Sequence, residues 1–366
     1  MNAKKIIVPV LVAAVGLSLV AGLSAGQKQK DKEKPQTKQE QEKIFIPKEI
    51  KAILAEGLPT KQGRQDIPVS IYYNLFLPAQ QNFHDIFFLK MKNSSLGFAP
   101  VSATPAVPPA PPKKGPQQAA VQETPQLLQA NFILFIQFNL LKEGAQPESV
   151  KEIYVPCTFQ VPAEGFDPEA EETYTFGYPM PAGHYILAIA VTSPDLKTVG
   201  TAYYDFAVPD PAGFAKSLET TPIFFVKEME QMEGVETRTV VHRGFFTYSV
   251  LKVIPNLEKT FSAGQNLDIF FFIFGTQPNA ENQYDIEVNF EVKQGEKSSI
   301  KWAAQNYQNP LISQPLPLKQ TLNIKTGDQE RTETKDLPPG DYTLVAQIKD
   351  KISEKTITKT VDFTMK

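Results

Sequence analysis

The stretch PAGHYILAIAV, residues 181–191, recurs as PPGDYTLVAQI at residues 338–348, an offset of 157 residues. In both copies a glycine precedes a tyrosine, and from that tyrosine onward every second residue is apolar. This alternation is typical of a strand with one buried face, and the glycine suits a turn that needs a positive φ. The same offset aligns Asp205-Phe206 with Asp362-Phe363. Each copy therefore predicts a turn, a strand, a loop and a closing strand.

Two weaker similarities extend this repeat toward the N-terminus. QNFHDIFF at residues 81–88 resembles QNLDIFF at residues 265–271, at an offset of 183. At an offset of 152, three alternating apolar residues fall on three others: Ile136, Phe138 and Leu140 on Val288, Phe290 and Val292. The two offsets differ by about the length of the proline-rich stretch 97–126. We therefore expect that stretch to be a solvated insertion in one loop of the first copy, with a docking motif for an aromatic groove as the alternative.

Short strand-like segments with turn signals between them fill most of the chain. This pattern indicates a sandwich or barrel rather than helices that alternate with parallel strands. The predicted strand-like segments are 69–77, 85–93, 132–141, 151–161, 171–176, 179–191, 200–208, 223–227, 244–254, 267–274, 284–292, 318–325, 341–348 and 355–364. One short helix is expected at residues 47–58. Ile50, Ile53 and Leu54 would share one of its faces.

The repeated Pro-x-Gly-x-Tyr-x-Leu turn and strand resembles bacterial immunoglobulin-like and fibronectin-III-like sandwich domains. The resemblance covers the turn and last two strands of each copy, and it implies a fold class and no ligand. The cysteine–tryptophan–cysteine core of antibody-type domains is missing, because the chain has one cysteine and one tryptophan. As a whole the chain resembles exported tandem-sandwich proteins of bacteria, which implies no activity. The expected fold class is all-β, with two tandem antiparallel β-sandwich domains.

The N-terminus has the layout of a secretory signal peptide. Lys4 and Lys5 precede an apolar run at residues 6–20, and small residues follow it. Cleavage after Ala25 or after Gly26 fits this layout, and a retained membrane anchor is the alternative. We therefore expect an exported protein, periplasmic or extracellular, that meets the membrane only through this segment during export.

Composition and the repeat together divide the chain into segments. The stretch after the signal peptide contains no apolar side chain, so we expect it to be a disordered tether. The predicted segments are a signal peptide at 1–26, the charged tether at 27–43, a first sandwich at 44–210 with the insertion at 97–126, a linker at 211–221 and a second sandwich at 222–366.

Charge and cysteine content narrow the possible partners and chemistry. The net charge of −3 becomes −5 without residues 1–26, which carry two lysines and no acid. A mildly acidic chain without a basic stripe is not expected to bind nucleic acid. Cys157 has no partner for an intrachain disulfide, so we expect a buried, unreactive thiol in a strand. The core alone must then hold each sandwich together.

Catalytic and metal-binding patterns are missing from the sequence. His84, His184 and His242 have no second ligand at a metal-binding spacing, and nucleophile-elbow and phosphate-loop motifs are absent. The acidic stretch 164–172 lacks the spacing of a calcium loop. Aspartates that recur in both copies are expected to cap turns rather than to form a catalytic pair: Asp85 with Asp268 and Asp205 with Asp362. We therefore expect no enzyme activity, no cofactor and no metal.

Two apolar runs, at residues 132–138 and 267–274, carry aromatic side chains on both faces of a predicted strand. A sandwich strand with one solvated face should alternate with polar residues instead. Their outer faces are therefore either covered within the chain or available to a partner. The candidate interface residues are Phe270, Phe272, Phe274, Phe132, Phe135 and Phe138.

Three functions remain compatible with the sequence. The one we expect is an exported non-enzymatic binding or scaffolding protein that engages a protein partner in the cell envelope through sandwich faces or loops. A carbohydrate-binding module is the first alternative, and its aromatic platform would be Tyr72, Tyr73, Tyr203, Tyr204 and Trp302. A hydrolase with a site built from scattered residues is the second alternative.

Overall fold

A computed structural model describes residues 46–79, 82–101, 126–214, 216–326 and 329–366. Strands make up 59% of the described residues and helices 6%, in several antiparallel sheets, which confirms the expected all-β sandwich class. The predicted signal peptide (1–26), the tether (27–43) and nearly all of the insertion (97–126) lie outside the described residues and stay predictions. Among the described residues, no helix has the length and apolar character needed to cross a membrane.

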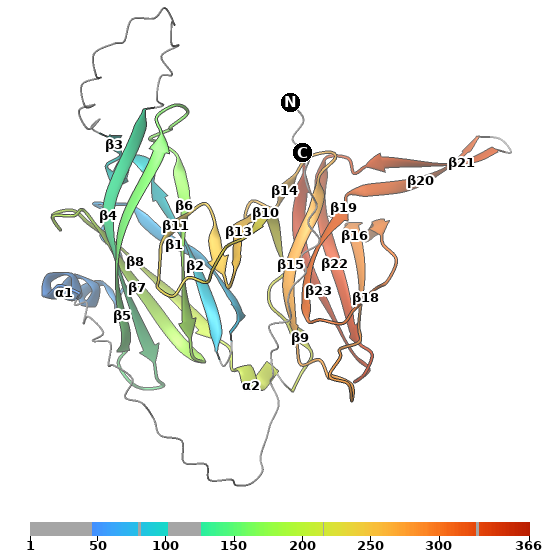
Figure 1. Ribbon diagram of the computed structural model, residues 1–366, viewed down its shortest axis with the longest axis horizontal. Coiled ribbons are helices and arrows are strands. Elements are labelled where there is room, and N and C mark those ends of the chain that lie inside the picture. The colour runs from blue at the N-terminus through green and yellow to red at the C-terminus, as the bar shows by residue number, and fades with distance from the viewer. Residues whose placement is uncertain (1–45, 80–81, 102–125, 215, 327–328) are drawn as a thin grey trace, which may run out of the picture. The chain divides into compact units, whose positions relative to one another are not determined.

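The first sandwich consists of two sheets (Figure 1). One sheet has the order β1-β2-β6-β11, with bounds Val69–Pro78, Phe83–Lys92, Glu171–Met180 and His242–Arg243. The other has the order β3-β4-β7-β8, with bounds Ala99–Pro100, Leu127–Leu141, Gly183–Thr192 and Val199–Val208, and β5 (Glu148–Pro162) pairs with the other edge of β4. A 3-10 turn, η1 (Asn93–Leu96), follows β2.

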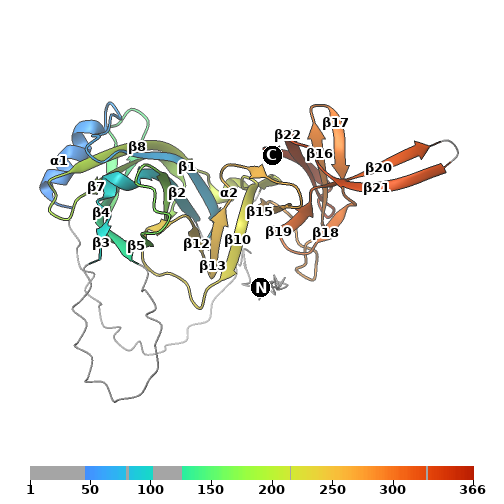
Figure 2. The same cartoon turned by 90° about the horizontal axis from the view of Figure 1, so that it is seen from above.

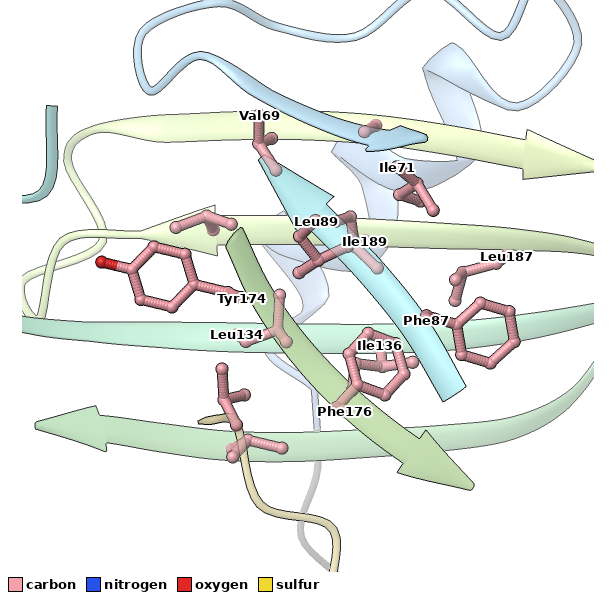
Figure 3. Packing of buried hydrophobic residues seen from close by; sticks show 14 of the residues in the cluster. Val69, Ile71, Phe87, Leu89, Leu134, Ile136, Tyr174, Phe176, Leu187 and Ile189 are labelled. Carbon is pink, nitrogen blue, oxygen red and sulfur yellow. The ribbon is translucent and has the colours of Figure 1, made fainter. Parts of the chain in front are cut away.

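The core of the first sandwich lies between these two sheets. Figure 3 shows Phe87 of β2 and Phe176 of β6 facing Ile136 of β4 and Leu187 of β7. Phe87 stacks on Phe176 with ring centroids 5.2 Å apart, and it meets Phe206 edge-on at 4.9 Å. Such aromatic contacts add to the area that each ring buries. Packed phenylalanine side chains therefore make up much of the core that stabilises this sandwich, which has no disulfide among the described residues.

Helix α1 (Lys48–Gly57) confirms the predicted helix at residues 47–58 and covers the outer face of β4 and β7. Ile50 and Leu54 are fully buried there, against Phe135 on the outer face of β4. The Tyr203 hydroxyl of β8 donates a hydrogen bond to the Leu54 carbonyl at 3.0 Å. The helix therefore explains why the residues of β4 are apolar on both faces.

The second sandwich repeats this arrangement with its own two sheets. The first sheet has the order β12-β13-β10-β15-β19, with bounds Phe246–Tyr248, Leu251–Pro255, Phe224–Gln231, Asn266–Phe274 and Leu311–Pro317, and β9 (Glu219–Thr220) pairs with β15. The second has the order β14-β23-β22-β16-β17, with bounds Thr260–Phe261, Lys355–Met365, Gly340–Asp350, Ile286–Gln294 and Lys297–Lys301, and β18 (Gln305–Tyr307) pairs with β16. The short pairing of β14 with β23 is parallel. Helix α2 (Pro211–Phe214) lies between the two halves of the sequence.

The repeated turn and strand have the same hydrogen bonds in both sandwiches. The Tyr185 hydroxyl donates to the Pro181 carbonyl at 3.1 Å, and the Tyr342 hydroxyl donates to the Pro338 carbonyl at 2.9 Å. Each tyrosine stacks on the phenylalanine of the closing strand, at 5.5 and 5.7 Å. Both preceding glycines have positive φ, as predicted, at 157° and 149°. The internal repeat is therefore present at the level of individual contacts.

The weaker alignment at an offset of 152 is wrong by two residues. Ile136 pairs with Ile189 in the first sandwich, and Phe290 pairs with Ala346 in the second. Because Ile189 and Ala346 are 157 residues apart, Phe290 is the true counterpart of Ile136, at an offset of 154. A shift of two residues keeps every side chain on its face, so the sequence pattern did not reveal the error.

Candidate interaction surfaces

His84, His184 and His242 belong to no metal-binding group among the described residues. His184 is exposed on β7, whereas His84 of β2 is half-buried and its pKa is lowered by burial. His242 Nε2 lies 3.0 Å from Glu236 Oε2, which also accepts a hydrogen bond from the Thr247 hydroxyl. Within the described residues, no three histidine, cysteine or carboxylate side chains form a group that could hold a metal.

The recurring aspartates lie inside strands, so the prediction that they cap turns is wrong. Asp205 pairs with Lys61, and Asp362 accepts a hydrogen bond from the Thr343 hydroxyl at 2.6 Å. Asp268 lies within β15. Sequence alignment found these positions but could not show that their roles differ between the two copies.

Asp85 is fully buried in the core of the first sandwich. Its Oδ1 accepts a hydrogen bond from the Asn74 amide at 3.1 Å, and the Asn74 Oδ1 accepts one from the Tyr204 hydroxyl at 3.1 Å. Its Oδ2 is buried without a hydrogen-bond partner. Burial raises the pKa of Asp85 to about 7, although the bond from Asn74 opposes this. Asp85 is thus a buried core carboxyl whose charged form is disfavoured by burial.

The acidic stretch 164–172 is held by ion pairs with neighbouring strands. Lys92 pairs with Glu169, and Arg243 lies 2.9 Å from Glu172. The Asp167 carbonyl accepts a hydrogen bond from the Asn93 side chain at 2.8 Å. These contacts give the stretch a structural role.

All six candidate interface phenylalanines pack against other parts of the same chain. Phe132 and Phe138 lie in the core of the first sandwich, and Phe135 lies under α1. Phe270 and Phe272 are buried between the two sandwiches, with 1% and 8% of their surface exposed. Phe274 is half-buried against Phe83 and Phe214. The structure therefore shows the first of the two arrangements that the sequence left open, cover within the chain.

An apolar cluster, here called the junction core, joins the outer face of the β1-β2 sheet to the outer face of the β10-β15 sheet. Its buried members are Leu75, Leu77, Ile86, Phe88, Phe224, Val226, Phe246, Val253, Phe270 and Phe272. Phe88 meets Phe246 edge-on at 6.0 Å, and the Tyr248 hydroxyl donates to the Pro78 carbonyl at 2.5 Å. Residues 44–366 accordingly form one compact unit.

A second connection is the strap, residues 232–245, which runs between β10 and β12. Its strand β11 pairs with β6 of the first sandwich, with His242 opposite Thr175. The Gly244 amide donates to the Thr173 carbonyl at 2.8 Å, and the Thr175 hydroxyl donates to the Phe245 carbonyl at 2.5 Å. Part of the predicted second domain therefore completes a sheet of the first. The sequence gives no pattern for a two-residue strand.

The aromatic residues considered as a sugar platform do not share one exposed surface. Tyr72 and Tyr73 pack at the edge of the junction core, and Tyr204 packs against the core of the first sandwich. Tyr203 lies against α1, and Trp302 packs on the core of the second sandwich. No flat stacking surface is formed by this set.

The open hollow beside the repeated turn of the second sandwich contains three carboxylates. Its lining includes Glu258, Asp341 and Asp362. Asp341 accepts a hydrogen bond from Thr364 at 2.8 Å, and Asp362 accepts one from Thr343. Two of the three carboxylates are thus bound to neighbouring threonines, which is a structural arrangement typical of paired strands.

A two-stranded ribbon, β20 (Lys319–Thr326) and β21 (Gln329–Asp336), extends beyond the sheets of the second sandwich (Figure 2). Eight residue pairs join the two strands, from Lys319 opposite Asp336 to Thr326 opposite Gln329, and no other described strand pairs with them. At its base, the Leu337 amide donates to the Leu318 carbonyl at 3.1 Å, and both leucines are buried. The ribbon lies between β19 and β22 in the sequence, and the counterparts of these two strands in the first sandwich, β6 and β7, are joined by two residues only.

No protein-family model matches the chain, and no curated protein matches it. Among solved structures, the chain is similar to a mutant of Salmonella alpha-2-macroglobulin, with 8% identity and a TM-score of 0.18 over 83% of this chain and 16% of that chain. The Salmonella alpha-2-macroglobulin that was reacted with methylamine gives 9% identity and a TM-score of 0.18, over 83% and 17%. The chain spans about a sixth of the length of these structures, and a likeness at this TM-score carries no argument about its function.

Proposed function

We propose that this chain is an exported, non-enzymatic scaffolding protein that holds a surface for a protein partner at a fixed geometry in the cell envelope. The observation that carries the proposal is the junction core. Ten buried apolar residues and the strap join the two sandwiches, whereas a flexible linker would leave them independent. A rigid pair of modules is what a spacer or adaptor requires, because it fixes the distance between its two ends.

The surface that remains for a partner is mainly polar. The apolar faces of β4 and β15 are covered by α1 and by the other sandwich. Exposed large apolar side chains in the described residues are scattered, and they include Val235 and Val240 of the strap and Val150 of β5. A partner would therefore bind through strand edges, loops and polar side chains, as weaker and regulated complexes do.

The proposal is tested by capture of partners with the predicted mature chain, residues 27–366, from envelope extract. Each captured protein is then purified and titrated against the chain, and a saturable one-to-one complex is the expected result. A matched bait lacks the ribbon, because a two-residue Asn-Gly turn replaces residues 319–336 between Leu318 and Leu337. We expect the fold to tolerate that replacement, because the Leu337 amide already donates a hydrogen bond to the Leu318 carbonyl at 3.1 Å.

A glycan array run in parallel separates this proposal from its alternative. Saturable glycan binding without any reconstituted protein complex would reject the scaffolding role and favour a carbohydrate-binding module. If the chain forms no reconstituted protein complex and binds no glycan, the scaffolding role is also rejected.

A further inference from the structure

We propose that β21 pairs with β21 of a second copy of this chain, antiparallel and with Thr332 opposite its counterpart, so that two ribbons form one four-stranded sheet. This inference stands apart from the proposed function, because it concerns the purified chain alone. It begins from the pairing of the ribbon: eight residue pairs join its two strands, and no third strand among the described residues pairs with either of them. An isolated two-stranded pair is marginally stable in water, and a third and fourth strand would remedy this.

Backbone geometry limits how β21 can pair with its own copy. Along a strand, the amide and carbonyl groups of every second residue point to the same edge. In an antiparallel pair, the backbone groups of two directly opposed residues either both point toward the partner strand or both point away from it. The numbers of two opposed residues must therefore have the same parity. A two-fold axis then passes through one residue, and near the middle of β21 that residue is Thr332 or Glu333.

Charge selects between these two registers. With the axis at Thr332, Arg331 of each copy lies opposite Glu333 of the other, and Lys335 lies opposite Gln329. With the axis at Glu333, the opposed pairs are Arg331 with Lys335 and Glu333 with itself, all of like charge. Opposite charges stabilise a cross-strand pair and like charges destabilise it. Of these two central registers, the one centred on Thr332 is therefore self-complementary.

The charged side chains of β21 are available for these contacts. Arg331, Glu333 and Lys335 have 73%, 38% and 53% of their side-chain surface exposed, and they form loose ion pairs within the strand at 4.0 and 3.3 Å. Charged edge strands normally resist pairing with other chains. In β21 the signs alternate at Arg331, Glu333 and Lys335. Opposite charges therefore face each other in the register centred on Thr332, and like charges do so in the register centred on Glu333.

The other edge of the ribbon does not offer the same pairing. The charged residues of β20 are Lys319 and Lys325, and the strand has no acidic residue. Pairing of β20 with β21 of another copy would be heterologous and would continue into an open fibre rather than close as a dimer. Pairing of β21 with itself buries one edge of each copy and closes.

The test is sedimentation equilibrium of the purified chain over micromolar to sub-millimolar concentrations. We expect a reversible dimer, and we expect Glu333→Arg to weaken it by about tenfold or more, because two attractive pairs become repulsive. Reversal of both charges, Arg331→Glu with Glu333→Arg, restores the pairing and is expected to restore the dimer to within about threefold. Glu296→Arg, which makes the same charge change in the exposed β16–β17 turn, is the control and should leave the dimer unchanged.

A wild-type chain that is monomeric at every concentration would overturn the inference. So would a dimer that Glu333→Arg leaves intact, or one that the double reversal does not restore. Far-UV circular dichroism and urea midpoints verify that all variants fold, as expected for exposed side chains. A dimer without any captured partner would reject the proposed function and leave this inference standing, because the two are measured on different samples.

Discussion

The buried carboxyl of Asp85 predicts that the protein loses stability as the pH rises. The pKa of Asp85 is about 7 in the folded chain, against 3.8 as the ordinary value. Between these values the unfolded chain releases the proton while the folded chain retains it, so the free energy of unfolding falls with rising pH. About three units at 1.36 kcal/mol each make the loss about 4 kcal/mol above pH 7. The groups that face Asp85 are Asn74, Tyr185 and Tyr204, and none of them is a cation that would hold its charge.

Substitution of Asp85 by asparagine removes this titration and keeps the shape of the side chain. Its amide oxygen can still accept the hydrogen bond from Asn74. We expect the Asp85→Asn variant to match the wild type near pH 4 to within about 1 kcal/mol and to exceed it by several kcal/mol at pH 8. The assay is urea unfolding followed by far-UV circular dichroism at a series of pH values from acid to mildly alkaline.

Two comparisons keep this prediction sharp. Asp205→Asn removes an exposed carboxylate of the same sandwich, and the loss of its ion pair with Lys61 should change stability by less than about 1 kcal/mol at all pH values. His84 acts in the opposite sense, because its lowered pKa makes stability fall as the pH drops below about 6.5. Parallel pH profiles for the wild type and Asp85→Asn would refute the reasoning.

Other side chains give predictions that need only routine measurements. Tyr185→Phe and Tyr342→Phe each remove one partly buried hydrogen bond, so each should lower the free energy of unfolding by about 1 kcal/mol, and the losses should add in the double variant. Phe88→Ala should cost about 3–5 kcal/mol, because it opens a cavity in the junction core, and an unchanged urea midpoint would contradict this. Cys157 should react with a thiol reagent only in denaturant, since it is buried and burial raises its pKa to about 12, and labelling of the native chain would show otherwise.

The sequence predicted those parts of the fold in which local pattern and burial agree. The alternation after Tyr185 and Tyr342 predicted both strands and their turns, because a strand with one buried face must alternate. The apolar faces of β4 and β15 indicated either cover within the chain or a surface for a partner, and the structure shows cover. What covers them could not be predicted, because a buried face does not specify its neighbour. Here the neighbours are α1 in one case and the other sandwich in the other.

The segments that sequence reasoning missed have no apolar periodicity of their own. The first strand of the ribbon was predicted at residues 318–325, but β21 was not, since QERTETKD offers no buried face. The predicted strand 244–254 is interrupted at Ser249, which has a φ of 53° and separates β12 from β13. The strap was missed for a similar reason, because two residues of β11 are too few to show a period.

The candidate site was less predictable than the fold. Six phenylalanines were predicted as candidate interface residues, but in the structure each of them packs on the chain itself. The sequence did not predict the ribbon as an interaction surface, because polar side chains are the norm on a solvated surface. Interaction surfaces of this kind become visible only when the pairing of strands is known.

The strap also sets the order in which the protein can be completed as it is synthesised. The edge of β6 is covered by residues that follow the second sandwich's own strand β10. The outer face of β1 and β2 is covered by β10 together with later strands, β12, β13 and β15. When only the first half of the chain has been synthesised, this sheet is therefore uncovered, and Leu75, Leu77 and Phe88 lie on its surface. A fragment cut at the linker would expose the same face. During synthesis, a chaperone that recognises extended apolar surface could bind this face until β12 and β15 have been made and cover it.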